Sequence, residues 1–309
     1  MYLLECKIYL ALESFFVPDL SCIKPFFVQI YLAHYLLIMP LKIKNKTYQA
    51  LLFDVDDTLI DTSQSYDEAI KKTVKNAVQI EVSDEQINLV RSHGMAYGVN
   101  NDWHVTWLLI QLVKHFSTEQ WKMILTEKKM DAINPNSAEF IEIKAFFQNL
   151  YLGNPPFNGQ GLIDTAEEKI YTEKFFPTLK TLGIKIAVVT SRPTDEAFYT
   201  LNHANALVGE FIESEDLIIS AGSQHADGQF IAEKPSPEPI LECVKRLKVG
   251  IKESVYVGNS SSDYLAAKEA GVDFIQVGNS QIERDNEPKG FHYFKLNSVN
   301  DILSLMING

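Results

Sequence analysis

Short runs of apolar residues recur along the chain, and each is bounded by polar or turn-forming residues. The runs hold five to seven residues and are rich in β-branched side chains. This pattern is typical of strands that are buried on both faces of a parallel sheet. The predicted strands are 49–54, 184–190, 216–220, 254–258 and 273–277.

Helical patterns separate the later strands. They cover 194–206, 237–247 and 263–269, and Gly271 follows the third as a C-terminal cap. Regular alternation of strand and helix favours connections that wind over both faces of one sheet. The predicted fold class is therefore α/β, with a doubly wound Rossmann-like parallel sheet as the core.

Residues 64–160 break this alternation, because no strand pattern occurs there. A connection of this length is too long for a simple loop. Ser117 and Gln120 have the spacing of a capping box at the start of one helix. We therefore expect an inserted all-helical cap domain at 64–160, with 154–159 as the return linker. The core then comprises 47–63 and 161–309. The predicted cap helices are 64–78, 84–93, 103–116, 118–129 and 138–150.

The first 46 residues read as an N-terminal extension. Segment 26–39 is apolar, but it is shorter than the roughly 20 residues that span a bilayer, and it contains Gln29 and His34. The favoured interpretation is a poorly ordered extension or a start-site artefact, since Met39 begins a plausible chain. A membrane-surface or partner-binding helix is the alternative.

Composition narrows the class of protein. The chain has 309 residues, 46% of them hydrophobic, and a formal net charge of −12 without a dense basic run. Such a charge disfavours nucleic acids and anionic membranes as partners. The three cysteines show no CxxC spacing, and their odd number argues against a disulfide framework. A cytoplasmic protein, monomeric or homodimeric, is expected.

Carboxylates follow the first predicted strand directly. In "LLFDVDDTLID", residues 51–61, the acids Asp54, Asp56 and Asp57 come after three large apolar residues. Buried charge is costly unless a cation compensates it. Asp57 and Asp61 are expected to form Asx-turns or caps. Asp54 and Asp56 are instead expected to lie beside a positively charged group or ion.

Four motifs in order make the chain resemble the haloacid dehalogenase-like hydrolases. They are the DxDxT run from Asp54 to Thr58, Thr190 after an apolar strand, Lys234 in "AEKPSPEP", and "YVGNSSSDYLAAKEAGV" at 256–272. The resemblance covers roughly residues 49–305. A helical insertion after the first motif is similar to the phosphoglycolate-phosphatase-like branch.

The resemblance implies a phosphoryl-transfer site at the strand ends. Asp54, held most rigidly, would be the nucleophile, and Asp56 the general acid and base. Lys234 would supply a fixed positive charge, and Thr190 a hydroxyl for a phosphoryl oxygen. Thr58 would brace the loop and Asp56, and it is a further candidate for phosphate binding.

Two neighbours of Thr190 stay open as phosphate-binding candidates. Ser191 also has a hydroxyl, and Arg192 would hold either a substrate anion or merely a surface carboxylate.

The implied cofactor is Mg²⁺, a hard cation that prefers oxygen ligands. The candidate ligands are Asp54, a carbonyl near Asp56, Asn259 and Asp263. The family usually has an acid where this chain has Asn259. An amide oxygen binds a hard cation but removes one negative charge, so we expect weaker metal binding.

The predicted cap contains an unusual loop, "HGMAYGVNNDW" at 93–103. Asn100 and Asn101 are its candidate substrate contacts. Alternatively, Asn101 or Asp102 caps the helix that follows. Trp103 and Trp107 lie four residues apart and are expected in the core of the cap.

The leading hypothesis is a Mg²⁺-dependent hydrolase of a small phosphorylated metabolite, acting through an aspartyl-phosphate. A phosphosugar mutase would share all four motifs. A phosphonate hydrolase would use a cap lysine such as Lys71, Lys72 or Lys75. A dehalogenase is disfavoured because it does not need Asp56. A non-catalytic binding module is the alternative from another class.

Overall fold

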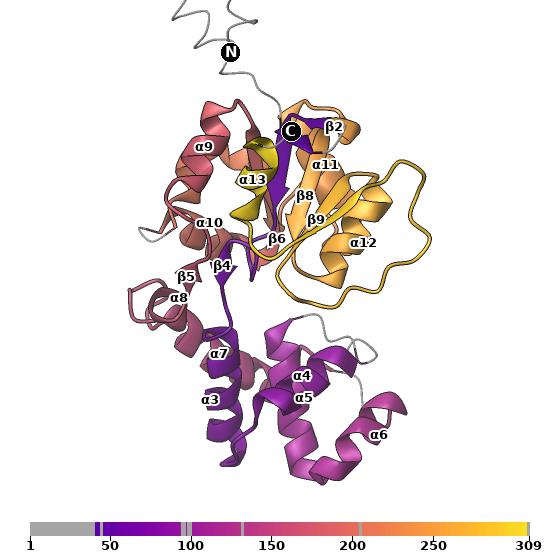
Figure 1. Cartoon of the computed structure of the whole chain (residues 1–309). Helices are drawn as coiled ribbons and strands as arrows, with labels where there is room; N and C mark the ends of the chain where they lie inside the picture. Colours follow the sequence, from indigo (N-terminus) through magenta and orange to yellow (C-terminus); the bar gives the residue numbers. More distant parts are fainter. Residues whose placement is uncertain are drawn as a thin grey trace, which may run out of the picture.

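The structure, a computed structural model, describes residues 41–43, 46–93, 97, 101–130, 133–203 and 206–307. Two lobes lie one above the other, an α/β lobe and a helical lobe (Figure 1). The prediction for the apolar segment 26–39 lies outside the described residues.

A six-stranded parallel sheet forms the centre of the α/β lobe, in the order β10-β9-β8-β3-β6-β7. All five predicted strands are present, so the predicted fold class is confirmed. The edge strand β10 was not predicted, because its side chains are partly exposed and form no buried apolar run. The strands are β3 (Ala50–Phe53), β6 (Lys185–Pro193), β7 (Ile218–Ala221), β8 (Ser254–Gly258), β9 (Asp273–Val277) and β10 (Tyr293–Leu296).

Both faces of the sheet are buried, because alternate side chains of each strand enter two different hydrophobic clusters. Leu51 and Phe53 of β3 belong to one cluster, and Ala50 and Leu52 to the other. Helices α9 (Phe175–Thr181), α10 (Thr194–Asn202) and α13 (Asp301–Ile307) contribute to the first cluster. Helices α11 (Glu238–Leu247) and α12 (Ser261–Ala270) contribute to the second. Short 3₁₀ turns are η3 (Val208–Phe211), η4 (Glu215–Leu217) and η5 (Ile251–Glu253).

The helical lobe has a hydrophobic core of its own, which includes Leu108, Trp121 and Phe147. Each predicted helix is present, but the fourth is divided into a 3₁₀ turn and a short α-helix. Ser117 and Gln120 do form the predicted capping box. The elements are α3 (Tyr66–Val78), α4 (Asp84–His93), α5 (Asp102–His115), η2 (Thr118–Gln120), α6 (Trp121–Thr126), α7 (Ala138–Leu152) and α8 (Leu162–Thr165).

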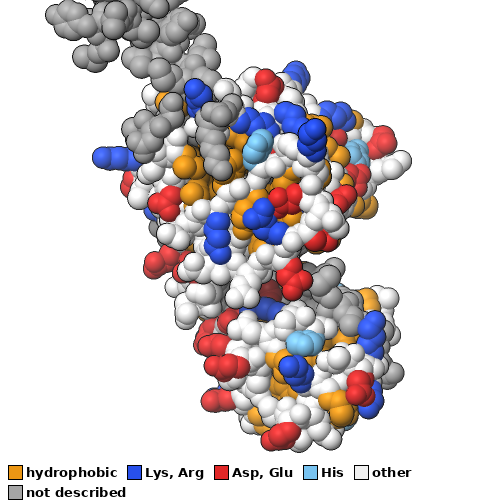
Figure 2. Space-filling view, turned by 45° about the vertical axis from the view of Figure 1, so that its right-hand side comes forward, with side chains coloured by type: hydrophobic (Ala, Val, Ile, Leu, Met, Phe, Trp, Pro, Cys, Tyr) orange, Lys and Arg blue, Asp and Glu red, His pale blue; other side chains and the backbone are white. Residues whose placement is uncertain are grey.

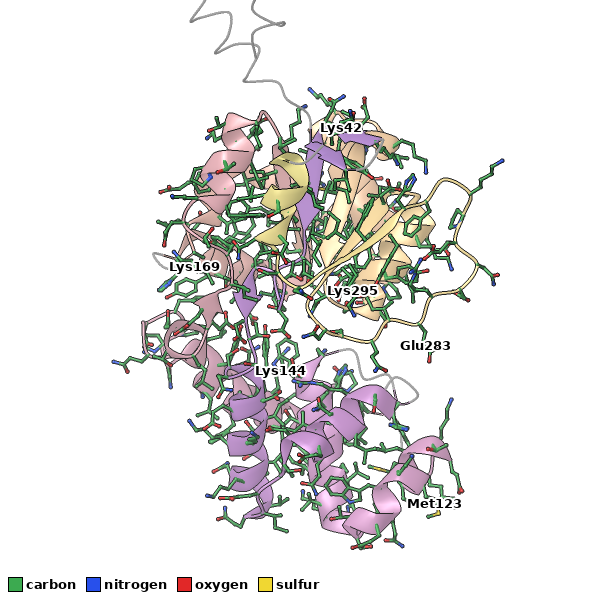
Figure 3. The ribbon with its side chains drawn as sticks, in the orientation of Figure 1. Lys42, Met123, Lys144, Lys169, Glu283 and Lys295 are labelled. Carbon is green, nitrogen blue, oxygen red and sulfur yellow. The ribbon has the colours of Figure 1, made fainter. Side chains whose placement is uncertain are left out.

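Trp103 and Trp107 pack against that core, as expected. Lys144 of α7 stacks on the Trp103 ring at 3.7 Å from its centre, on the side of the lobe that faces the sheet (Figure 3). None of the helices in the described ranges is long and apolar enough to span a bilayer.

Two very short strands connect the lobes. β4 (Ile60–Asp61) pairs antiparallel with β5 (Glu168–Lys169), and this pair lies between the lobes (Figure 1). In the space-filling view the surface narrows there, and charged side chains are exposed along the constriction (Figure 2). The sequence did not predict this pair, because two residues are too few for a strand pattern.

A hairpin precedes the first central strand, next to the boundary predicted at residue 46. β1 (Leu41–Ile43) pairs with β2 (Lys46–Tyr48). Lys46 Nζ and Tyr48 OH donate to one carboxylate oxygen of Asp273 at 2.5 and 2.6 Å. The hairpin is therefore anchored to β9 of the sheet.

Candidate active site

The candidate residues gather where three neighbouring strands end. β3 lies between β8 and β6, and the backbone N–H of Asp54 donates to the Val257 carbonyl of β8 at 2.9 Å. The chain runs from β3 to β6 and β7 on one side and returns to β8 on the other. Such a switch in winding direction leaves a crevice at the carboxyl ends of the strands, where ligands bind in open α/β sheets.

Lys234 joins two buried carboxylates. Its Nζ donates to Asp54 Oδ1 and Asp263 Oδ1, both at 2.6 Å, and to Tyr256 OH at 3.0 Å. Tyr256 OH in turn lies 2.8 Å from the Val189 carbonyl. All three ammonium protons have acceptors, so the Lys234 charge is held at a fixed point beside Asp54.

The pKa values of the Asp54 and Asp263 carboxyl groups are shifted in opposite directions. Burial, together with the neighbouring Asp263 charge, raises the pKa of Asp54 to about 8, although Lys234 acts in the opposite direction. For Asp263, burial also raises the pKa, but Lys234 and Ser260 outweigh it and the net pKa is lowered. Asp263 therefore carries the negative charge, and Asp54 needs a further cation to be fully ionised at neutral pH.

Asp263 has protein partners on both oxygens. Oδ2 accepts from the Ser260 hydroxyl at 2.6 Å and from the backbone N–H groups of Ser260 and Asn259 at 3.0 and 3.2 Å. The carboxylate thereby closes the N-terminus of α12 in a capping box. Its predicted role as a metal ligand stays a prediction.

Of the two alternatives predicted for Arg192, a substrate anion or a surface carboxylate, its sequence neighbours could not decide; in the structure its guanidinium contacts carboxylates of the protein. Its side chain is fully buried. Nε donates to Asp56 Oδ1 at 2.5 Å, Nη1 to Thr200 Oγ1 at 2.6 Å, and Nη2 to Glu167 Oε2 at 3.0 Å. Every guanidinium nitrogen already has a protein acceptor, so the side chain is not presented to a ligand.

The hydroxyl candidates differ in environment. Thr190 is buried, and its Oγ1 accepts from the backbone N–H of Arg192 at 3.2 Å, which leaves the hydroxyl proton for another acceptor. Ser191 is exposed. The hydroxyl of Thr58 is buried and has no hydrogen-bond partner among the described residues. It does not hold Asp56 through its side chain, contrary to expectation.

The loop after β3 is folded by its own backbone and by Asp57. The Val55 carbonyl accepts from the N–H groups of Leu59 and Ile60 at 2.8 and 3.0 Å. Asp57 has a φ of 53° and accepts from the N–H and hydroxyl of Thr62. These bonds confirm a turn-forming role for Asp57 and turn the chain sharply after the nucleophile candidate.

The chemistry of the oxygen donors fits a hard cation. Asp54 brings a carboxylate, Asp56 a main-chain carbonyl, and Asn259, directly after β8, an amide. No group of three His, Cys, Asp or Glu side chains in the part of the chain that is described is arranged to hold a metal. Mg²⁺ is compatible with such a donor set, because it keeps several waters and uses only one or two carboxylates.

The predicted substrate contacts of the helical lobe are only partly visible. Asn101 is the N-cap of α5, with its side chain accepting from the His104 N–H at 3.0 Å, which confirms the capping alternative. Asn100, like most of the 93–103 loop, lies outside the described residues.

Polar residues that sequence analysis missed connect the lobes. Tyr151 of α7 donates to Glu167 at 2.8 Å, and its ring stacks on Tyr66 of α3 with centroids 4.7 Å apart. Gln148 of α7 donates to Glu196 of α10 at 3.4 Å. Polar residues scattered in helices give no sequence signal of this kind, because each is also compatible with an exposed helix face.

A family model described as haloacid dehalogenase-like hydrolase matches residues 48–271. The chain belongs to the haloacid dehalogenase-like hydrolases. This confirms the predicted resemblance and the predicted class of enzyme, a hydrolase. The matched range includes Asp54, Thr190, Lys234 and Asn259.

Similarity to individual proteins covers most of the chain. The chain is 31% identical over 232 residues, 72% of its length, to imidazoleglycerol-phosphate dehydratase of Phytophthora nicotianae, of which it spans only 42%. It is 24% identical over 235 residues to phosphoglycolate phosphatase of Colwellia psychrerythraea, covering 76% and 85% of the two chains. The crystal structure of CbbY from Rhodobacter sphaeroides in complex with phosphate shares the fold, with a TM-score of 0.53, 18% identity, and 84% and 100% coverage.

Proposed function

We propose that this haloacid dehalogenase-like hydrolase is a Mg²⁺-dependent phosphatase of a small cytosolic phosphorylated metabolite. The observation that carries the proposal is the contact of Lys234 with Asp54 at 2.6 Å, which fixes a cation beside a buried, rigidly held carboxylate. A relative named phosphoglycolate phosphatase supports the same chemistry.

Asp54 would act as the nucleophile. Its carboxylate attacks phosphorus, the bond from phosphorus to the ester oxygen breaks, and the electron pair leaves with that oxygen. Lys234 lies against Asp54 and would stabilise charge on the transferring group. The proton of the buried Thr190 hydroxyl would reach a phosphoryl oxygen, and the exposed Ser191 stays a secondary candidate.

Asp56 would act as the general acid in the first step and as the general base in the second. In the first step its carboxyl donates a proton to the departing oxygen, and in the second it takes a proton from the attacking water. The bond from phosphorus to Asp54 then breaks and restores both carboxyl groups. The side chain of Asp56 is 33% exposed, which gives it access to both oxygens.

Asp54, the main-chain carbonyl of Asp56 and the Asn259 amide oxygen would hold Mg²⁺, which supplies positive charge at the phosphoryl group when bound. The site needs it. Around Lys234 and Arg192, four carboxylates face two cations: Asp54, Asp263, Asp56 and Glu167. Because Asp263 is saturated by Lys234 and Ser260, we propose that it anchors Lys234 rather than the metal.

The helical lobe would act as a cap that selects the substrate. A phosphonate hydrolase finds no support in its first helix. Lys71 and Lys75 pair with Asp84 and Glu81, and these partners raise the pKa of both lysines. A Schiff-base lysine needs a lowered pKa. Lys72 pairs with Glu68.

The test is hydrolysis of para-nitrophenyl phosphate across a Mg²⁺ titration, with Asp54→Asn as the control. We expect metal-dependent turnover that falls ~10³-fold or more in the control. Asn259→Asp restores a carboxylate and should lower the half-saturating Mg²⁺ about tenfold, which corresponds to ~1.4 kcal/mol. Turnover that survives in Asp54→Asn would refute the mechanism. A phosphoenzyme that forms but transfers its phosphoryl group only to a sugar phosphate would identify a mutase.

A further inference from the structure

A buried cluster of charged and aromatic side chains lies behind Asp56, where the two lobes meet. Arg192 is its centre, with one nitrogen on Asp56, one on Thr200 and one on Glu167. The guanidinium carbon also lies 5.8 Å from the centre of the Tyr66 ring, which comes from the helical lobe.

Glu167 is held in the cluster by hydrogen bonds to both of its carboxylate oxygens. Oε1 accepts from Tyr151 at 2.8 Å and from the Ser65 hydroxyl at 3.0 Å, while Oε2 accepts from Arg192. Glu167 directly precedes β5, one of the two connecting strands. The guanidinium plane is thus fixed from both the α/β lobe and the helical lobe.

Such a cluster is not explained by stability alone. Desolvation of buried ion pairs commonly offsets their attraction, so apolar side chains would stabilise this junction equally well. What the cluster does is limit the freedom of one side chain. Asp56 lies in the loop after β3, and its side chain is 33% exposed, so without Arg192 it would sample several rotamers.

The contact between Arg192 and Asp56 involves only one of the two carboxylate oxygens. Arg192 Nε takes only Oδ1 of Asp56, and Oδ2 has no hydrogen-bond partner within the described parts of the chain. An Asp carboxylate held by one oxygen keeps the other free to carry a proton in a fixed direction. A bidentate contact with the guanidinium would have occupied both oxygens.

We propose that Arg192 is a positioning residue that aims the free Oδ2 of Asp56 at the departing oxygen of the substrate, with Thr200 and Glu167 fixing Arg192 itself. This inference rests on the proposed function, since it assigns Arg192 to the acid step of that reaction. It replaces the predicted contact of Arg192 with a substrate anion.

The leaving group distinguishes positioning from a merely structural role. An alkyl phosphate releases a strongly basic alkoxide and needs the proton from Asp56, whereas para-nitrophenyl phosphate releases a weak base and needs it little. kcat/KM reports the steps up to release of the first product. Misplacing Asp56 should therefore lower kcat/KM selectively for alkyl phosphates.

The experiment compares Arg192→Lys with the wild type on both substrates at saturating Mg²⁺. We expect a loss of roughly 100-fold in kcat/KM for the alkyl phosphate and less than about fivefold for the aryl phosphate, within the range of general acid catalysis. Thr200→Val removes one anchor of Arg192 and keeps every charge, so it should shift kcat/KM in the same direction by a smaller factor. Arg246→Lys is the matched control, because Arg246 pairs with Glu242 on α11 away from this cluster.

A double-mutant cycle completes the test. If Arg192 acts through Asp56, adding Arg192→Lys to Asp56→Asn should cost little further activity on alkyl phosphates. Equal losses on both substrates in Arg192→Lys and Thr200→Val, or additive losses in the cycle, would overturn the inference while wild-type turnover still upholds the proposed function. A wild type without phosphatase activity would overturn the proposed function and, with it, this role for Arg192.

Discussion

Burial raises the pKa of both glutamates behind the site, but their hydrogen-bond partners differ. Glu167 accepts hydrogen bonds from Arg192, Tyr151 and Ser65, so its charge is compensated. Glu196 is also buried, but within the described residues its carboxylate accepts one long hydrogen bond, from the neutral Gln148 amide. Burial raises the pKa of Glu196 to about 7, although Arg192 acts in the opposite direction. Near neutral pH, this side chain is therefore partly protonated in the folded protein.

Stability should consequently depend on pH through Glu196. Its folded pKa of about 7 lies above the ordinary value of 4.5, so the folded state binds the proton more tightly. The resulting stabilisation is fully present below pH 4.5 and is lost as pH rises through 7. It amounts to ~3 kcal/mol. Urea unfolding of wild type and Glu196→Gln at pH 5 and pH 8 measures it. A free-energy difference between the two proteins that does not change with pH would contradict the assignment.

At the scale of elements, helix α12 links fold and site through its first turn. Ser260 caps the helix, and Asp263 at the third helical position returns the bond to Ser260. The same Asp263 carboxylate holds Lys234 against Asp54. A capping motif that ordinarily serves helix stability therefore also orients the cation of the site.

Ser260→Ala should lower both stability and activity. Loss of the cap costs about 1 kcal/mol of unfolding free energy. Because Asp263 then loses one of the hydrogen bonds that orient it, we also expect kcat to fall about tenfold. Ser117→Ala is the matched control, since it removes a capping box at η2 in the helical lobe. It should cost a similar amount of stability and leave kcat unchanged. Equal kcat in the two variants would refute the link between the α12 cap and Lys234.

On the scale of the whole molecule, the two lobes have separate hydrophobic cores and are joined by a short connection. The sheet has buried clusters on both faces, and the helical lobe has a third cluster around Leu108, Trp121 and Phe147. Between them the chain passes through β4 and β5, which have two residues each. A junction of this kind allows each lobe to unfold without the other.

Phe147→Ala tests that independence. The side chain is fully buried in the helical cluster, so its truncation should cost about 3–5 kcal/mol. Hydrogen exchange followed by mass spectrometry should show faster exchange in α3, α5 and α7, with unchanged exchange in β3, β6 and β8. Uniform acceleration across both lobes would show that the protein unfolds as one unit instead.

The sequence by itself determined the sheet, because strands buried on both faces must be apolar along their whole length. For the same reason it did not reveal β10, whose side chains are partly exposed, or the two-residue strands β4 and β5. The helices of the second lobe followed from their apolar periodicity and their caps. Four short motifs indicated Asp54, Asp56, Thr190 and Lys234 as candidate site residues.

Tertiary structure alone decided which charges meet. Arg192 follows Thr190 closely in sequence, yet its guanidinium contacts Asp56, 136 positions away, and Glu167, 25 positions away. Asp263 likewise meets Lys234 only when α12 packs against β8 and β9. The physical reason is that a local pattern reports burial and periodicity. The partner of a buried charge depends instead on the winding order of the sheet and on where the second lobe closes against it.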